Sequence, residues 1–192
     1  MVGLGGYLLH GYLASYLIKV VGLSPTQAFG ANLVAVVTLA LGALTGGYLV
    51  DRYRPAAIGL ASAVTIGIVV VPCFLLIQRG TVAWAILGQI PIAAGLGIAA
   101  TFGATRSASL FPAEVRYTAS GVAHNVTVTL FGSTAPYLST WLIARTGSPS
   151  MPAWYLAGMA LVGVTVALVL LAAGRASVPN ASAYAAAPPT LR

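Results

Sequence analysis

Six long runs of apolar residues, separated by short polar breaks, make up most of the chain. Each is near or above the ~17 residues that a helix needs to cross ~30 Å of hydrocarbon. The runs are continuous and lack the ~10-residue alternation of a membrane barrel. The pattern predicts an all-α membrane protein with six transmembrane helices, at residues 2–17, 26–50, 56–77, 82–104, 118–143 and 153–173.

The breaks between the runs carry residues that start and end helices. Ser24 precedes Pro25, which suits an N-cap followed by the first helical position. Longer polar loops are expected over 105–116 and 145–152. After the last run, residues 175–192 are rich in Ala, Pro and Ser and are expected to be a disordered tail on the cytoplasmic side.

The composition agrees with a chain that lies mostly in lipid. Hydrophobic residues make up 59% of it and charged residues only 6%, against roughly 25% charged residues in a soluble domain. The net charge of +7 does not indicate nucleic acid, because the nine basic residues are scattered singly between apolar runs. Cys73 is the only cysteine, so the chain cannot form an internal disulfide.

The basic residues also predict the orientation in the membrane. Six of them fall on one side of the expected bundle and three on the other, and cytoplasmic loops carry the excess of Arg and Lys. Both termini are therefore expected in the cytoplasm, with a location in the plasma (inner) membrane. The larger group is Arg52, Arg54, Arg106, Arg116, Arg175 and Arg192, and the smaller is Lys19, Arg79 and Arg145.

Small residues and prolines indicate how the helices pack. Gly42 and Gly46 form a GxxxG pattern in the second run, which permits close contact between helices. Pro72, Pro91 and Pro136 lie within runs, where proline is tolerated and tends to kink the helix. Such kinks suit a transporter that moves, but they also occur in static bundles.

The first loop that decides the class reads GGYLVDRYRP over residues 46–55. It resembles the G-x-L-x-D-R-x-G-R-R signature of the major facilitator superfamily, in the copy between the eighth and ninth helices. Gly47, Leu49, Asp51 and Arg52 match, whereas Tyr53-Arg54-Pro55 is a shortened form of the basic end. The resemblance implies that Asp51 and Arg52 latch the cytoplasmic ends of helices in one transport state.

A second loop narrows the resemblance. The run FPAEVRYTASG over 111–121, followed by His124-Asn125, by 134–136 and by MPAWYL over 151–156, is similar to the metabolite–proton symporter family of that superfamily. The similarity implies the C-terminal six helices of a twelve-helix fold, as two inverted three-helix repeats over about 1–77 and 82–173. Residues 1–174 are then one half-domain, expected to be a fragment, a truncated product or a half that needs its N-terminal six-helix partner.

Four charged residues in these loops are candidate gating residues: Asp51, Arg52, Glu114 and Arg116. For Asp51 and Arg52 the alternative is simple anchoring of a helix end at the membrane surface. Glu114 and Arg116 fit a gate-side ion-pair network and a solvated loop equally well. Exposed ion pairs contribute only ~0–1 kcal/mol each, so a latch built from them would switch easily.

The candidate path for substrate and protons lies on the fifth and first helices. No Asp, Glu, Lys or Arg falls well inside a run, which leaves His124 and His10 as the intramembrane ionisable groups. His124 could carry a proton or bind a carboxylate, or it could be a neutral side chain hydrogen-bonded to a neighbouring helix. Tyr7 shares a helix face with His10. Tyr12 and Tyr16 share another face, which is compatible with lining a cavity, but an interfacial aromatic belt explains Tyr16 as well.

The fifth helix also has a polar, small-residue face. Asn125 and Thr129 belong to it, and it should line the transport path or be buried against other helices, because unsatisfied polar groups in hydrocarbon are costly. Gln89 and Asn32 are single polar residues in spans, which favours interhelical hydrogen bonds. The face comprises Gly121, Asn125, Thr129, Gly132 and Pro136, opposite Val122, Val126 and Leu130.

These observations favour a secondary transporter that moves a small polar metabolite with protons by alternating access. The alternative is a non-transporting remnant or an accessory membrane subunit. An enzyme is not indicated: Ser120 and His124 are four residues apart, yet no nucleophile elbow or orienting carboxylate accompanies them. No H-E-x-x-H motif is present, and no metal or cofactor is expected. The coupling group would be His124 or would lie in the other half.

Overall fold

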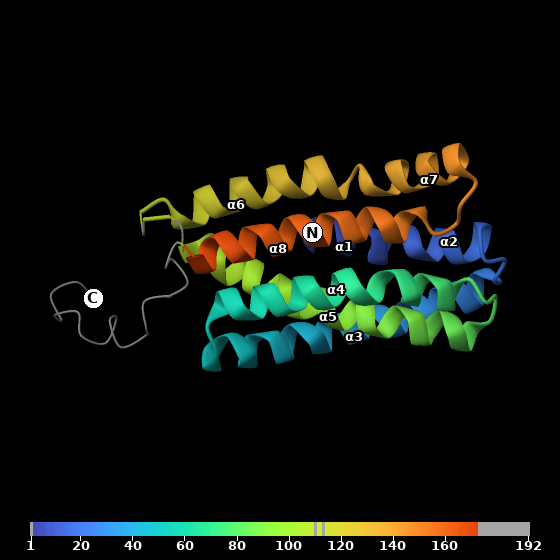
Figure 1. Cartoon of the computed structure of the whole chain (residues 1–192), viewed down its shortest axis with the longest axis horizontal. Helices are drawn as coiled ribbons and strands as arrows, with labels where there is room; N and C mark the ends of the chain where they lie inside the picture. The colour runs from blue at the N-terminus through green and yellow to red at the C-terminus, as the bar shows by residue number, and fades with distance from the viewer. Residues whose placement is uncertain (1, 110, 113, 173–192) are drawn as a thin grey trace, which may run out of the picture.

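In the computed structural model, residues 2–109, 111–112 and 114–172 are described, and they form an elongated bundle of helices (Figure 1). Four helices run without interruption, and all four are long and apolar enough to cross a membrane. The tail predicted over 175–192 lies outside the described residues. The four helices are α3 (Pro25–Arg52), α4 (Pro55–Ile77), α5 (Val82–Ser109) and α8 (Met151–Ala172).

The other two rods of the bundle contain π-helical turns. Each of the six predicted runs is thus helical, and the first and fifth contain a π turn that was not predicted. An extra residue in a π turn shifts the side chains that follow, and such turns often occur at functional sites. The first rod is α1 (Val2–Tyr7), η1 (Leu8–Tyr12) and α2 (Leu13–Lys19), and the fifth is α6 (Arg116–Thr127), η2 (Val128–Gly132) and α7 (Ala135–Thr146).

Local chemistry explains where helices begin and end. The Ser24 hydroxyl accepts a hydrogen bond from the Gln27 backbone N–H, and the Gln27 side chain accepts one from the Ser24 backbone N–H, so the predicted cap before Pro25 is confirmed. Such a capping box satisfies two backbone donors that the first turn leaves free. The loop expected from Thr105 was wrong at its start, because α5 continues to Ser109. No proline or glycine lies between Gly103 and Pro112.

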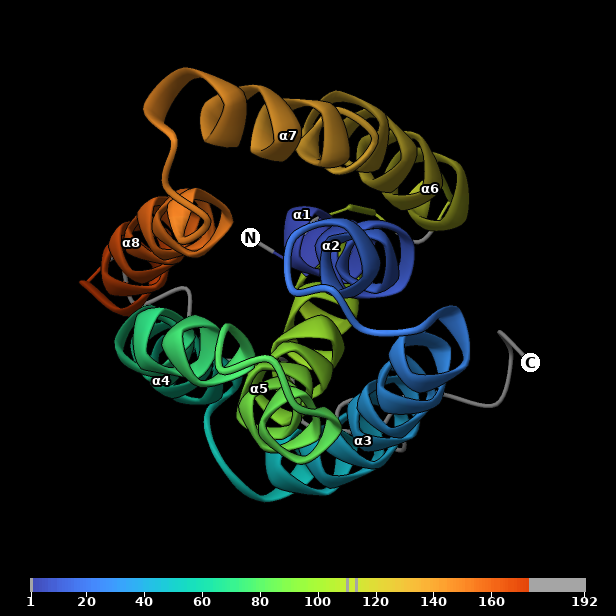
Figure 2. The same cartoon turned by 90° about the vertical axis from the view of Figure 1, so that its right-hand side faces the viewer.

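α5 lies in the interior of the bundle, with α3, α4 and the first rod around it (Figure 2). It approaches α3 closely because glycines line the contact. A methyl group at Gly42 would lie 2.6 Å from the Ala94 carbonyl oxygen, and one at Gly46 would lie 2.9 Å from the Ile98 Cα. The close contact predicted from the GxxxG pattern is confirmed. The Thr101 hydroxyl adds an interhelical hydrogen bond of 3.0 Å to the Ala43 carbonyl.

The outer surface of the bundle is apolar. Large aliphatic and aromatic side chains on α3 face outward, and Leu44 is 72% exposed. A continuous exposed apolar surface of this kind is compatible with lipid and not with water. The structure therefore agrees with a multi-pass membrane protein. The outward-facing residues of α3 include Phe29, Leu33, Val37, Leu41 and Leu44.

The polar connections gather at the two ends of the bundle (Figure 1). The α3–α4 and α5–α6 connections lie at one end, and the α2–α3, α4–α5 and α7–α8 connections lie at the other. Arginine side chains at this second end stack on tryptophans: Arg79 lies 4.9 Å from the Trp84 ring centroid and Arg145 lies 5.5 Å from that of Trp141. Arginine on an aromatic ring at a helix end suits a membrane interface.

Tyr16 and Gln89 lie in the core and make hydrogen bonds other than those expected from the sequence. Tyr16 is 1% exposed, its hydroxyl donates to the Pro149 carbonyl at 2.8 Å, and its ring packs edge-on against Phe74. It is a core residue, so neither the aromatic belt nor the lining of the cavity describes it. Gln89 is fully buried and donates to the Ala85 carbonyl of its own helix at 3.0 Å. The expected interhelical bond is absent, and the Gln89 Oε1 atom and the Asn32 Oδ1 atom have no partner among the described residues.

Candidate functional site

The break in the fifth rod follows from Pro136. Proline has no backbone N–H, and its ring clashes with the carbonyl four residues earlier, which here is that of Gly132. The chain accommodates this with the π turn η2, closed by a bond of 3.1 Å from the Ser133 N–H to the Val128 carbonyl. α7 then restarts at Ala135. α6 and α7 are thus separate helical segments joined at η2.

η2 is where this rod meets the first helix. A methyl group at Gly132 would lie 2.8 Å from the Tyr7 ring and 3.2 Å from the Gly3 carbonyl oxygen. One at Gly3 would lie 3.4 Å from the Val128 side chain. Glycines on both sides therefore allow the two backbones to approach closely. The Tyr7 ring is held against the π turn by this contact.

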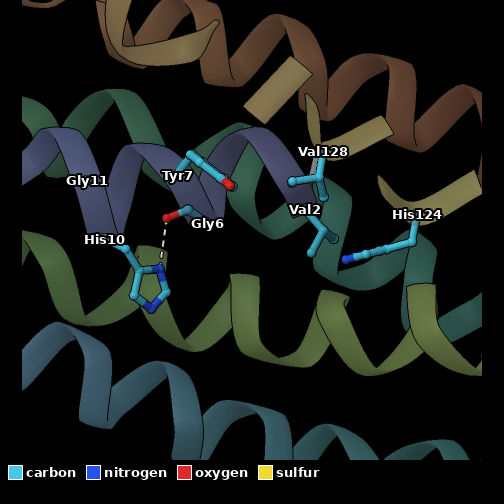
Figure 3. A pocket seen from close by; sticks show the side chains of 8 residues that line it. Val2, Gly6, Tyr7, His10, Gly11, His124 and Val128 are labelled. Atoms are coloured by element: carbon cyan, nitrogen blue, oxygen red, sulfur yellow. Dashed lines mark hydrogen bonds between the residues drawn. The ribbon is translucent and has the colours of Figure 1, made fainter. Parts of the chain in front are cut away.

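A cavity of about 440 Å³ opens beside the contact, between the first helix and α6 (Figure 3). This volume suits a small metabolite. Both π turns border it, since His10 and Gly11 belong to η1 and Val128 belongs to η2. The lining residues are Val2, Gly3, Gly6, Tyr7, His10, Gly11, His124 and Val128.

The cavity brings together three of the five predicted path residues, namely Tyr7, His10 and His124. His124 extends from α6 toward Val2, whereas His10 lies further along the first helix (Figure 3). His124 lies ~12 Å from the start of α6 at Arg116, at 1.5 Å per residue. The cavity is therefore well below the bundle end where the α5–α6 connection lies.

The ring of His10 is fixed by a hydrogen bond. Its Nδ1 atom lies 2.8 Å from the Gly6 carbonyl oxygen (Figure 3). A carbonyl can only accept, so Nδ1 carries the proton in the neutral ring. The partner of one ring nitrogen sets the state of the other. Nε2 of neutral His10 therefore has a free lone pair.

The structure does not bring Asn125 and Thr129 to the cavity. His124 of α6 and Val128 of η2 line it, and successive residues of a helix are turned by ~100°. Asn125 and Thr129 therefore lie on the adjacent face. The Asn125 side chain is exposed and donates to the Gly121 carbonyl of its own helix at 2.9 Å.

α6 as a whole is poorly covered. It has no buried residue, and exposed side chains lie all around it, from Asn125 on the polar face to Val126, which is 52% exposed on the other. Apolar residues can face lipid, but a polar helix face in hydrocarbon requires a partner or water. The polar face of α6 is therefore a surface that the described bundle leaves uncovered.

Among the residues that the structure describes, none of those lining the cavity is Asp, Glu, Lys or Arg. Its polar groups are the Tyr7 hydroxyl, the two imidazoles and backbone carbonyls. Among the described residues, no three His, Cys, Asp or Glu side chains lie close enough together to hold a metal ion. The described lining residues can therefore form hydrogen bonds with a ligand, and the two histidines can bind and release a proton.

The four predicted gating residues lie at one end of the bundle, at the α3–α4 and α5–α6 connections. Asp51 and Arg52 are exposed in the last turn of α3, and the Arg52 guanidinium lies 4.7 Å from the Tyr48 ring centroid. Glu114 is exposed. Arg116 begins α6, and its Nε donates to the Phe111 carbonyl at 3.3 Å. Their role in gating stays a prediction.

Sequence reasoning missed the apolar and glycine part of the lining. Three glycines of the first helix border the cavity, and at Gly6 and Gly11 an added methyl group would meet nothing within 4 Å. Their spacing around Tyr7 and His10 could have indicated an open helix face. The missed residues are Val2, Gly3, Gly6, Gly11 and Val128.

Comparison with known proteins shows which class of membrane protein the chain resembles. The chain is 30% identical over 167 residues to an ectoine/proline transporter of Corynebacterium glutamicum, a match that covers 83% of this chain and 33% of the relative. It is 27% identical over 168 residues to a proline/betaine transporter of Escherichia coli, covering 85% of this chain and 33% of the relative. The chain is a distant homologue of proline/betaine transporters. The family resemblance predicted from the two loops is confirmed.

Further comparisons define the extent of this homology. A putative proline/betaine transporter of Staphylococcus aureus is 29% identical over 163 residues, covering 83% of this chain and 34% of the relative. The chain spans about a third of the length of the curated relatives that it matches. These relatives are transporters and not enzymes. No family model matches the chain, and no solved structure matches it.

Proposed function

We propose that this chain is the C-terminal six-helix half of a proton-coupled secondary transporter. The complete transporter would carry a small zwitterion or organic acid across the plasma membrane by alternating access. The observation that carries the proposal is the cavity lined by Tyr7, His10 and His124 in a homologue of proline/betaine transporters. Transporters of this kind bind near the bilayer midplane and rock one helical bundle against another.

The uncovered polar face of α6 supports the need for a second half. Gly121 and Asn125 lie on this face, Thr129 follows in η2, and α6 contains no buried residue. A partner bundle of six helices would cover the face and close the open side of the cavity. The match to only about a third of each relative agrees with such a division.

The proposed gating follows from the ends of the helices. Asp51 and Arg52 end α3, and Arg116 begins α6. Their charges would bind the partner half in one state and release it in the other. Because exposed ion pairs contribute only ~0–1 kcal/mol each, the two states would differ little in free energy, as alternating access requires.

The proposal is tested by reconstitution into proteoliposomes with an imposed pH gradient. The chain alone should bind radiolabelled proline or glycine betaine without accumulating it. Together with the N-terminal half of the Corynebacterium glutamicum relative, it should restore gradient-dependent uptake. Strong uptake by the chain alone would contradict the half-transporter proposal. Binding without uptake in either preparation would favour a non-transporting accessory subunit.

A further inference from the structure

The first observation concerns the geometry of His10. Its Nδ1–H is bound to the Gly6 carbonyl at 2.8 Å, so only Nε2 can change its proton occupancy without breaking this bond. When Nε2 takes up a proton, the ring becomes a cation with one N–H held by the protein and one N–H free. Within the described part of the chain, His124 has no corresponding hydrogen bond. His10 is thus the imidazole whose orientation is fixed in advance.

The second observation is the charge of the cavity. A carboxylate in a mostly apolar cavity needs a positive partner, because burial of an unpaired charge is strongly unfavourable. No Lys or Arg of the described ranges lines the cavity. Of its titratable lining residues, Tyr7 cannot become a cation, which leaves the two histidines. A carboxylate ligand can therefore obtain a positive partner from the lining only if a histidine is protonated.

Apart from Tyr7, His10 and His124, the described titratable residues of η1 and of the helices packed against it do not line the cavity. η1 packs against α1, α2, α3 and α7. The nearest cation along its own rod is Lys19, ~14 Å away at 1.5 Å per residue. The described side chains of α5, at 82–105, include no titratable group. The remaining titratable residues of η1, α2, α3 and α7 are Tyr12, Tyr16, Tyr48, Asp51, Arg52, Tyr137 and Arg145, and His124 faces the cavity from α6.

We propose that a carboxylate ligand binds together with one proton, which His10 holds. A proton from water adds to Nε2 of the neutral ring, and no other bond is made or broken. The Nδ1–H stays on the Gly6 carbonyl, and the new Nε2–H donates to the ligand carboxylate. Release of the ligand returns the proton to water. This inference rests on the proposed function and names the coupling group, since the described lining of the cavity offers no carboxylate for that role.

The test measures proton uptake on binding. Proline is titrated calorimetrically into the full chain in lipid nanodiscs at pH 8, above the ordinary range of histidine titration, in two buffers with different ionisation enthalpies. The wild-type chain should take up about one proton per ligand bound. His10→Gln should bind at least tenfold more weakly and take up none. Glutamine can keep the bond to Gly6, because Gln89 makes the same bond to Ala85.

A matched control and a second readout complete the experiment. Thr165→Val removes a hydrogen bond of 2.9 Å to the carbonyl four residues earlier, outside the cavity, and should leave affinity and proton uptake unchanged. Since the chain has two histidines, ¹⁵N spectra of histidine-labelled protein can be assigned with the His124→Gln variant. The spectra should show His10 in the Nδ1–H form without ligand.

The outcomes separate the two proposals. Undiminished proton uptake in His10→Gln, or loss of uptake only in His124→Gln, would overturn the role of His10 while leaving the transport proposal intact. An Nε2–H tautomer of His10 would overturn that role in the same way. If the wild-type chain binds neither proline nor glycine betaine, both proposals fail. Uptake lost in His10→Gln and retained in Thr165→Val supports the inference.

Discussion

At the scale of single residues, glycine sets the distance between the central helices. At Gly42, any side chain would press on the Ala94 carbonyl of α5, which is backbone and cannot turn aside. Gly42→Val should therefore force α3 and α5 apart and destabilise the protein by about 1–3 kcal/mol, as overpacking does. Thermal unfolding of the purified chain in detergent would measure the change.

The matched control is Gly30→Ala on the same helix, where an added methyl group meets nothing within 4 Å. Alanine favours a helix over glycine by about 1 kcal/mol, so this variant should be as stable as wild type or slightly more stable. Equal losses at Gly42 and Gly30 would show that the close packing of α3 on α5 does not stabilise the bundle.

A second residue-scale prediction concerns Tyr16. Tyr16→Phe removes the hydrogen bond to Pro149 and keeps the ring contact with Phe74. The protein should lose about 0.5–1.5 kcal/mol, the usual contribution of one hydrogen bond. Tyr137→Phe serves as the control because Tyr137 is 71% exposed. If thermal unfolding shows no difference between the two variants, the Tyr16 bond does not tie α2 to the loop before α8.

Sequence reasoning succeeded where a residue's role depends on local spacing and failed where it depends on the neighbouring helix. The spacing of Gly42 and Gly46 alone predicts close helix contact, because small residues one turn apart allow it whichever helix is the neighbour. The partners of Tyr16 and Gln89 depend on which helix lies opposite. That information is not contained in the local sequence, so an aromatic belt and an interhelical bond were reasonable expectations that the three-dimensional packing overturned.

At the scale of helical elements, η2 holds the fifth rod on the bundle. Gly132→Leu would place a side chain against Tyr7 and the Gly3 carbonyl. Because α6 has no buried residue to resist, it should move away and carry His124 from the cavity. Proline binding to the reconstituted chain should fall at least tenfold, which corresponds to about 1.4 kcal/mol.

The control for this variant is Gly158→Ala in α8, where an added methyl group, unlike one at Gly132, meets nothing within 4 Å. It should bind proline as wild type does. If Gly132→Leu binds proline normally, the contact between η2 and the first helix does not position the cavity, and the two rods must be held together by other means.

Helix ends were easier to predict than helix interruptions. The cap at Ser24 and Pro25 is a short-range pattern with a local cause, and the structure confirms it. The π turns were not predicted. Pro136 marks one break, but proline in a membrane helix is compatible with a kink, a π turn or an unbroken helix. η1 contains no proline, so glycine is the only residue type in its sequence that could have indicated a π turn.

At the scale of the whole molecule, the cavity depends on the pairing of two rods far apart in sequence. Hydrophobic periodicity places Tyr7 and His10 on one helix face, but it does not say that α6 lies opposite. The structure brings these residues to His124 and leaves Asn125 and Thr129 on the adjacent face. The chemistry of the candidate site could thus be predicted from the sequence, whereas its composition required the arrangement of the helices.

The arrangement of the connections makes a prediction about topology. Tyr53 lies between α3 and α4 at one end of the bundle, and Ser148 lies between α7 and α8 at the other. In a Cys73→Ala background, Tyr53→Cys and Ser148→Cys should react with a membrane-impermeant maleimide from opposite sides. Within the described ranges, four arginines lie toward the Tyr53 end (Arg52, Arg54, Arg106 and Arg116), against Lys19, Arg79 and Arg145 at the other. Tyr53→Cys should therefore be labelled only after the cells are opened, and Ser148→Cys in intact cells. Labelling of both from the same side would mean that α4 to α7 do not cross the membrane as the bundle requires. Reversed labelling would retain the bundle and overturn the cytoplasmic location proposed for Asp51, Arg52 and Arg116, and with it their part in a cytoplasmic gate.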